Sequence, residues 1–382
     1  MLAEERTMQI TAISMPTWGL TMEEGTLLEW LVPEGTRVEL GTEIAEIETT
    51  KVTNVLEAQE PGVLRRHVIR PGETRGCGAL IGVLAEEDVP DSAVEEFIAR
   101  FAEKPANEAP SKGPEPRQID LPDGRRIRYL QVGDGGTPAL LIHGFGGDLD
   151  AWQAIQSGLA VNRAVYALDL PGHGESTKDV QAGDLAALAE TINQAMDTLG
   201  LERAHLVGHS LGGGAVMQLA LARRNRVASL NLIAPVALGD DIDPVFLREF
   251  LAATKTRDLQ RCLGRLFANP SIVGRGFADQ VSRNKRLDGA EAALSKIVAA
   301  CFPEGRQRAV LLSELTTWIT DNPTVPVCAI WGEEDAILSP APLSTLPASV
   351  VRLFLPNVGH MPQLEAAKEV GALLSAQMGG VA

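Results

Sequence analysis

The stretch "AHLVGHSLGGGAVMQLALA", residues 204–222, decides the fold of the larger part of this chain. It starts as an apolar run typical of a buried strand, passes through Gly208, Ser210 and Gly212, and continues as a small-residue run typical of a helix. Glycines on either side of the serine allow a sharp strand-to-helix turn, which exposes the seryl oxygen at the helix N-terminus. Ser210 is therefore the candidate nucleophile.

Strand-like and helix-like segments alternate on both sides of this turn. Strand-like runs open the segments "ALLIHGFGG" (139–147), "AVYALDLPGHGES" (164–176), "VASLNLIAPVAL" (227–238) and "VPVCAIWGEEDAIL" (325–338). Such alternation predicts a mostly parallel sheet with helices on both faces, which we expect to span residues 117–382.

Two later residues supply the partners that a nucleophilic serine needs. Asp335 follows the strand-like run at 325–332, and His360 follows another such run at 350–356. The order serine, aspartate, histidine along the chain is the order expected in the α/β-hydrolase fold. Ser210, Asp335 and His360 are the predicted catalytic residues.

These motifs resemble the α/β-hydrolase superfamily over roughly residues 117–380. The turn "HGFGG", residues 143–147, follows an early strand, where that fold places its oxyanion loop. The backbone N–H groups of Phe145 and Leu211 are the candidate oxyanion donors. In this family an insertion at about 239–318, which is helix-prone here, forms a cap over the nucleophile.

Alternatives exist for the acid. Glu333 or Glu334 could replace Asp335, but the family pattern WGxxDxxxP favours Asp335, with Pro340 near the expected proline. Asp169 follows an earlier strand and is better explained as a residue that orders a turn. Structural, turn or supporting roles are expected for the five other histidines, namely His67, His143, His173, His205 and His209.

The N-terminal region contains an internal repeat. Residues 25–47 superpose in sequence on residues 62–84, so that glycines match glycines and apolar positions match apolar positions. Each half is too short to bury its own apolar face, and the matched turns predict two small sheets packed together. Lys51 falls between the two halves, in the β-prone run "IETTKVT".

Residues 8–85 resemble a lipoyl domain of the acyltransferases in 2-oxo acid dehydrogenase complexes. That resemblance implies that Lys51 carries lipoic acid in amide linkage. Thr50 and Val52 flank the lysine, whereas methionines are typical of the related biotinyl domain. The alternative is an ordinary solvated surface lysine.

The predicted domains are a lipoyl domain at 1–85, an acidic Pro/Ala-rich linker at 86–116, and the hydrolase-like domain at 117–382. The linker contains five prolines and cannot bury much apolar surface. Within it, Val94, Phe97, Ile98 and Phe101 have helical spacing and predict one short helix. We expect this helix to pack on a neighbouring domain; a helix that docks a partner is the alternative.

Composition excludes several classes of partner. The net charge of −16 and the pI near 4.9 argue against nucleic acids and anionic membranes, which bind clustered Lys and Arg. No stretch resembles a membrane span or a signal peptide, which predicts a cytoplasmic protein. The four cysteines show no paired spacing, so no metal site is indicated.

A small all-β lipoyl domain followed by a capped α/β-hydrolase domain resembles the dihydrolipoamide acetyltransferase component of acetoin dehydrogenase systems. The resemblance implies acetyl transfer from lipoyl-Lys51 to coenzyme A within a multienzyme complex, and a homo-oligomer of this chain is a reasonable expectation for such a component. It implies two partners, a thiamine-diphosphate-dependent acetoin-cleaving component and a dihydrolipoyl dehydrogenase. The HxxxDG motif of the usual acyltransferase domain and a peripheral-subunit-binding domain are both missing from the sequence.

Two other functions stay open at this point. An esterase or carbon-carbon bond hydrolase with an appended lipoyl carrier would release a free acid. A non-catalytic scaffold would keep the hydrolase fold for docking alone.

Overall fold

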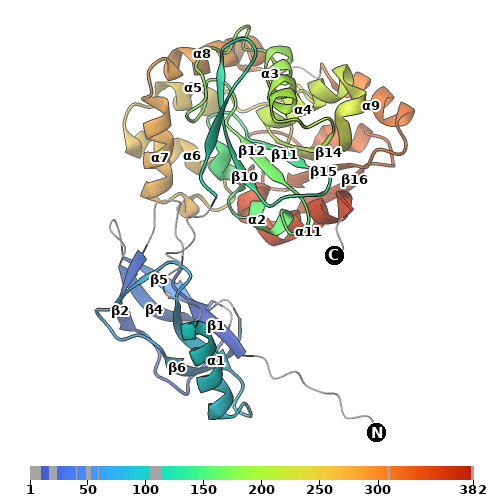
Figure 1. Cartoon of the computed structure of the whole chain (residues 1–382). Helices are drawn as coiled ribbons and strands as arrows, with labels where there is room; N and C mark the ends of the chain where they lie inside the picture. The colour runs from blue at the N-terminus through green and yellow to red at the C-terminus, as the bar shows by residue number, and fades with distance from the viewer. Residues whose placement is uncertain are drawn as a thin grey trace. The chain divides into compact units, whose positions relative to one another are not determined.

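The computed structural model describes residues 10–16, 24–39, 41–48, 53–58, 60–103, 114–307 and 310–379. The chain divides into two compact units, residues 1–113 and 114–382 (Figure 1). Each unit has its own apolar core.

The first unit contains two four-stranded sheets. One has the order β1-β8-β6-β3 and the other β5-β4-β2-β7. The strands are β1 (Ile10–Ser14), β2 (Glu24–Trp30), β3 (Arg37–Val38), β4 (Glu43–Glu48), β5 (Thr53–Glu57), β6 (Gly62–His67), β7 (Thr74–Gly76) and β8 (Leu80–Ala85). The inward-facing residues of both sheets form one core, as the small all-β fold predicted.

The internal repeat is visible in the backbone of this unit. Gly35 and Gly72 have φ angles of 85° and 86°, and Gly41 and Gly78 have 82° and 81°. Such left-handed angles favour glycine, which explains why glycine recurs at matched positions of the two halves. The two halves therefore use the same turns to build their sheets.

Helix α1 (Asp91–Glu103) packs on the first unit. Val94 and Phe97 lie against β8 residues in a small apolar cluster. Ion pairs from Arg65 to Asp91 (2.7 Å) and from Arg66 to Glu95 (2.8 Å) also hold the helix on this unit. The compact unit thus extends beyond residue 85 and includes the helix expected in the linker.

An eight-stranded sheet forms the centre of the second unit, in the order β16-β15-β14-β13-β11-β12-β10-β9. The six strands β16, β15, β14, β13, β11 and β12 run parallel to one another. Strand β10 is antiparallel to both of its neighbours, β12 and β9. The bounds are β9 (Arg117–Asp120), β10 (Arg126–Val132), β11 (Ala139–Ile142), β12 (Val165–Leu168), β13 (Ala204–His209), β14 (Val227–Ile233), β15 (Val327–Gly332) and β16 (Val351–Leu355).

Helices cover both faces of this sheet (Figure 1). One face carries α3 (Leu185–Thr198), α4 (Leu211–Ala222) and α9 (Leu312–Asp321), and the other carries α2 (Gln156–Leu159) and α11 (Ala367–Gln377). Alternate strand residues serve the two layers: Leu206 faces the first and Val207 the second. The expected mostly parallel, doubly covered sheet is confirmed.

Four helices between β14 and β15 gather at one side of the sheet (Figure 1, yellow to orange). They are α5 (Pro244–Ala252), α6 (Thr256–Gly264), α7 (Arg275–Lys285) and α8 (Ala290–Cys301). The sequence range proposed for the cap, 239–318, also includes part of α9, which packs beside α4 on the sheet. We call α5 to α8 the cap below.

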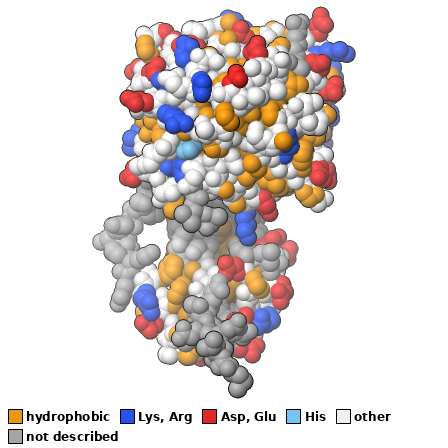
Figure 2. Space-filling view, turned by 90° about the vertical axis from the view of Figure 1, so that its right-hand side faces the viewer, with side chains coloured by type: hydrophobic (Ala, Val, Ile, Leu, Met, Phe, Trp, Pro, Cys, Tyr) orange, Lys and Arg blue, Asp and Glu red, His pale blue; other side chains and the backbone are white. Residues whose placement is uncertain are grey.

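The outer surface shows no strong segregation on the face in Figure 2, where basic, acidic and apolar side chains intermingle. No helix within the described ranges is long and apolar enough to cross a membrane.

Candidate active site

Ser210 occupies a strained turn between β13 and α4. Its φ and ψ are 50° and −114°, a backbone conformation that side-chain-bearing residues rarely adopt. A Cβ added at Gly208 would lie 2.5 Å from the Gly212 carbonyl oxygen, and one at Gly212 would lie 2.3 Å from the Ile142 carbonyl oxygen. Both flanking positions therefore require glycine, as the motif indicated.

His360 and Asp335 form a buried pair. The His360 Nδ1 atom lies 2.8 Å from Asp335 Oδ2, and both side chains are almost completely inaccessible to solvent. Because Nδ1 faces a carboxylate, we assign the proton to Nδ1, which leaves Nε2 free to accept a proton. Glu333 and Glu334, the alternative acids, are exposed.

The carboxylate of Asp335 is held in its charged form. Burial alone would raise its pKa, but the charge of His360 and hydrogen bonds to the carboxylate outweigh burial and lower the pKa. The backbone N–H groups of Ile337 and Leu338 donate to Oδ1 at 2.8 and 3.0 Å. Asp335 therefore orients the His360 ring with a fixed negative charge.

The residue before the serine links the turn to His360. His209 Nε2 lies 2.7 Å from the His360 carbonyl oxygen, and the two rings are 4.9 Å apart between centroids. Burial, together with the nearby His360, lowers the pKa of His209 to about 3. A neutral His209 that donates to the His360 backbone brings the β13 turn and the His360 loop together.

The "HGFGG" loop packs directly against the serine turn. A Cβ added at Gly144 would lie 2.7 Å from His209 Nδ1 and 3.0 Å from the Ser210 Cβ, so only glycine fits between the two segments. The N–H groups of Phe145 and Leu211 donate to no backbone acceptor within the described residues. These two amides are therefore available to a ligand beside Ser210.

A buried polar network centred on Asp169 lies beside this loop; the sequence indicated the turn-ordering role of Asp169 but not its partners. Asp169 Oδ1 accepts a hydrogen bond from the Leu149 N–H (2.7 Å), and Asp169 Oδ2 accepts one from the Glu175 N–H (3.0 Å). The Arg128 guanidinium also lies 3.3 Å from Oδ2. Burial, reinforced by the charge of Asp148, raises the pKa of Asp150 to about 7. Asp169 thus orders two loops and does not contact His360 through any hydrogen bond in the described chain.

The remaining histidines also have structural partners. Leu170 N–H donates to His143 Nε2 at 3.0 Å, which assigns the proton of that ring to Nδ1, 2.7 Å from the Gly144 carbonyl oxygen. His205 lies 2.8 Å from the Ser229 hydroxyl, and His67 stacks on Trp30 with 4.2 Å between ring centroids. His173 lies 3.0 Å from the Pro171 carbonyl oxygen.

The cap contacts the oxyanion loop at two points. The Asn284 amide donates to Asp148 Oδ2 at 2.7 Å, and the Phe250 ring lies 5.2 Å from the Phe145 ring between centroids. A Cβ at Gly146 would lie 2.4 Å from the Phe250 ring, so the cap touches the loop backbone itself. Nothing in the sequence pattern pointed to these contacts.

Lys51, the predicted lipoyl attachment residue, lies outside the described residues. The strands on either side of it are described: β4 and β5 pair antiparallel up to Glu48 opposite Thr53.

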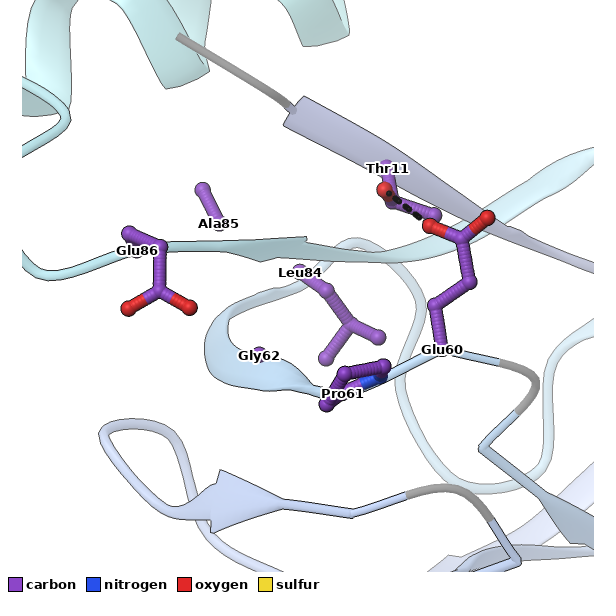
Figure 3. A pocket seen from close by; sticks show the side chains of 7 residues that line it. All are labelled: Thr11, Glu60, Pro61, Gly62, Leu84, Ala85 and Glu86. Carbon is purple, nitrogen blue, oxygen red and sulfur yellow. Dashed lines mark hydrogen bonds between the residues drawn. The ribbon is translucent and has the colours of Figure 1, made fainter. Parts of the chain in front are cut away.

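Two other features of the described chain carry no comparable chemistry. No group of three His, Cys, Asp or Glu residues there could hold a metal ion. A pocket in the first unit, shown in Figure 3, is bordered by Glu60 and Glu86. Thr11 donates to Glu60 at 3.0 Å and Arg37 pairs with Glu86 at 2.5 Å, so both acids are already engaged.

Comparison with protein families agrees with the two units. Residues 137–367 match the alpha/beta hydrolase fold family, and residues 11–84 match the family described as biotin-requiring enzyme, which covers biotinyl and lipoyl domains. Solved hydrolases share the fold of the second unit. A variant of the meta-cleavage product hydrolase from Pseudomonas fluorescens IP01 has a TM-score of 0.61 and 23% identity, and covers 69% of this chain and 97% of its own.

Curated relatives match both units together. A protein from Pseudomonas putida is 40% identical over 368 residues, which are 95% of this chain and 96% of the relative. A protein from Cupriavidus necator is 39% identical over 380 residues, 99% of this chain and 100% of the relative. Both are described as the dihydrolipoyllysine-residue acetyltransferase component of an acetoin cleaving system. This chain, a lipoyl domain followed by an α/β-hydrolase domain, therefore belongs to the family of those acetyltransferase components.

Proposed function

We propose that this protein transfers an acetyl group from lipoyl-Lys51 to coenzyme A through Ser210, His360 and Asp335. The buried pair of His360 and Asp335, joined through His209 to a serine on a strained turn, is the observation that carries the proposal. The relatives in acetoin cleaving systems support the acetyl group as cargo and lipoyl-lysine as its carrier.

The proposed first half-reaction forms an acetyl-enzyme. A lipoyl group on Lys51 supplies the acetyl group as a thioester. Ser210 Oγ attacks the acetyl carbonyl while His360 Nε2 takes the seryl proton, and the N–H groups of Phe145 and Leu211 stabilise the negative carbonyl oxygen. When the carbon-sulfur bond breaks, His360 returns its proton to the leaving sulfur.

In the second half-reaction, coenzyme A is the acceptor. His360 Nε2 takes the thiol proton, the sulfur attacks the acetyl-serine, and the proton passes to Ser210 Oγ as the ester bond breaks. The same steps with water would release acetate, so the site must exclude water. We assign that task to the cap, whose Phe250 packs on the oxyanion loop.

Membership of an acetoin cleaving system supports two partners. We propose that a thiamine-diphosphate-dependent component loads the acetyl group and that a dihydrolipoyl dehydrogenase reoxidises the dithiol. Homo-oligomerisation and a cytoplasmic location stay predictions of the sequence.

The test measures the fate of the acetyl group. Lipoylated full-length protein is reductively acetylated and mixed with coenzyme A, and acetyl-coenzyme A and acetate are quantified for wild type, Ser210→Ala and Lys51→Arg. We expect acetyl-coenzyme A from the wild type alone. Acetate formed regardless of coenzyme A would make the protein a hydrolase, and transfer that survives Ser210→Ala would remove the serine from the mechanism.

A further inference from the structure

The charge of the cap is opposite to that of the rest of the protein. The whole chain has 34 Lys and Arg against 50 Asp and Glu. Residues 255–286, which include α6 and α7, have eight Lys and Arg against two acids, Asp258 and Asp279. In so acidic a chain, a locally basic segment is the place where a polyanionic ligand would experience attraction.

Two backbone contacts bring the basic residues of α6 and α7 to the same end of the cap. Arg286 donates to the Thr254 carbonyl oxygen at 3.3 Å, and Lys285 donates to the Ala253 carbonyl oxygen at 2.9 Å. The C-terminus of α7 therefore lies against the loop that leads into α6. Lys255 and Arg257 follow this loop directly, and Arg283 is one turn from Arg286.

Four of these side chains are exposed: Lys255, Arg257, Arg283 and Arg286. Lys255 and Arg257 form no side-chain hydrogen bond or ion pair within the described residues. Of the two acids, Asp279 accepts from the Thr256 hydroxyl at 2.9 Å, and Asp258 lies 3.7 Å from Arg261. The acids thus have other partners, and Lys255 and Arg257 remain available to a ligand, whereas Arg283 and Arg286 each also donate to a neighbouring oxygen, on Gln280 and Thr254.

The distance from this end of the cap to the candidate active site suits an acceptor with an anionic head and a long thiol arm. The Leu266 carbonyl oxygen accepts from the His360 N–H at 2.8 Å, so the far end of α6 reaches the proposed base. From Arg257 to Leu266 the chain advances roughly 14 Å, at about 1.5 Å per residue. The pantetheine arm of coenzyme A has about twelve linearly bonded atoms, as many as four extended residues, which span roughly 13 Å.

We propose that Lys255, Arg257, Arg283 and Arg286, here called the basic cluster, bind the diphosphate and 3′-phosphate groups of coenzyme A. The inference rests on the proposed function, because it names the part of the cap that recognises the acceptor. Guanidinium and ammonium groups are the usual partners of phosphate oxygens. The cluster selects the nucleotide end of the acceptor and takes no part in the chemical step.

The test compares thiol acceptors that differ only in charge. KM and kcat are measured with coenzyme A, dephospho-coenzyme A and pantetheine, using acetylated full-length protein. The double variant Lys255→Gln/Arg257→Gln removes two unpaired cations. The matched control, Arg224→Gln/Lys368→Gln, removes the same charges from exposed positions outside the cap.

We expect the cluster variant to raise KM for coenzyme A about tenfold, as loss of charge-assisted contacts to phosphate predicts. KM for pantetheine and all kcat values should stay unchanged, and the control should behave as wild type. An equal rise in KM for pantetheine, or equal effects of the two double variants, would overturn the proposal.

Calorimetric titration with coenzyme A separates this inference from the proposed function. If the cluster variant binds coenzyme A about tenfold more weakly while wild type acetylates none of the three thiols, the cluster is supported and the proposed function fails. A wild-type protein that does not bind coenzyme A would overturn the cluster.

Discussion

At the scale of single residues, the site depends on which groups stay charged and which stay neutral. Asp335 is buried with its pKa lowered, so it remains a carboxylate beside His360. His209 and His205 are buried with their pKa values lowered to about 3 and about 4, so both remain neutral in the folded protein. His360, by contrast, has a carboxylate partner in Asp335, which suits it to be the base.

The carboxylate of Asp335 is expected to matter for the rate and not for the architecture. Asp335→Asn keeps the side-chain shape but no longer holds the proton on His360 Nδ1, so kcat for acetyl-coenzyme A formation should fall by roughly 10³–10⁴. Rapid-quench measurement of acetyl transfer would test this. Glu334→Gln, at the exposed residue next to Asp335, is the control and should leave kcat unchanged. An Asn variant of normal rate would exclude Asp335.

The neutral histidines predict how stability depends on pH. The unfolded chain binds a proton on histidine near pH 6.5, whereas folded His205 does so only near pH 4 because burial and the charges of Arg163 and Arg203 oppose it. Between these values the unfolded state binds more protons, so the free energy of unfolding should decrease as pH falls from 6.5 to 4. Urea unfolding of His205→Asn should show a shallower decrease than wild type; an equal slope would contradict the assignment.

At the scale of elements, three segments meet with glycine at each contact. The β13–α4 turn, the end of β11 and the "HGFGG" loop approach so closely that a single added carbon atom would collide with a backbone atom or a ring. The geometry of the oxyanion donors is therefore fixed by backbone packing and does not depend on flexible side chains.

Two helix glycines should respond to alanine in opposite ways. At Gly212, a Cβ would lie 2.3 Å from the Ile142 carbonyl oxygen, so Gly212→Ala should lower the free energy of unfolding by about 1–3 kcal/mol or more. At Gly276 in α7 no atom lies within 4 Å of the added carbon, so Gly276→Ala should raise it by about 0.5–1 kcal/mol. Urea midpoints measure both, and destabilisation of equal size would refute the packing argument.

The same elements show how far sequence could lead. Ser210, its glycines, and the strand ends that precede Asp335 and His360 were predicted because each lies in a local pattern. The contact of Asn284 with Asp148 joins residues 136 positions apart, and the ion pair of Arg66 with Glu95 had no local signal either. Helix α1 and its packing on a neighbouring domain were predicted from the spacing of its apolar residues, but the ion pairs from Arg65 and Arg66 that also hold it had no such signal.

At the scale of the whole molecule, the two units carry separate cores, and the described apolar clusters of each draw residues from that unit alone. Separate cores suit a protein in which one unit carries a group and the other processes it. Within the second unit, the cap is set apart by charge, because its segment 255–286 is basic whereas the chain as a whole is acidic.

Separate cores predict separate unfolding. Calorimetry of the full chain should show two transitions, and fragments 1–113 and 114–382, expressed alone, should each reproduce one of them. A control cut within a unit, between Gly200 and Leu201, should abolish the transition of the second unit. A single transition that disappears on separation would show instead that the units stabilise each other.

Gln307 gives the cap a further property. Its side chain accepts from the Ala237 N–H at 2.8 Å and donates to the Asp241 carbonyl oxygen at 2.6 Å, so the residue that leaves the cap is fastened to the residues that enter it. The two ends of the segment 241–307 therefore lie next to each other. A segment that begins and ends at one point can be replaced without moving the sheet, so a different set of helices joined to the same two anchor points would leave the strands that carry Ser210, Asp335 and His360 in place.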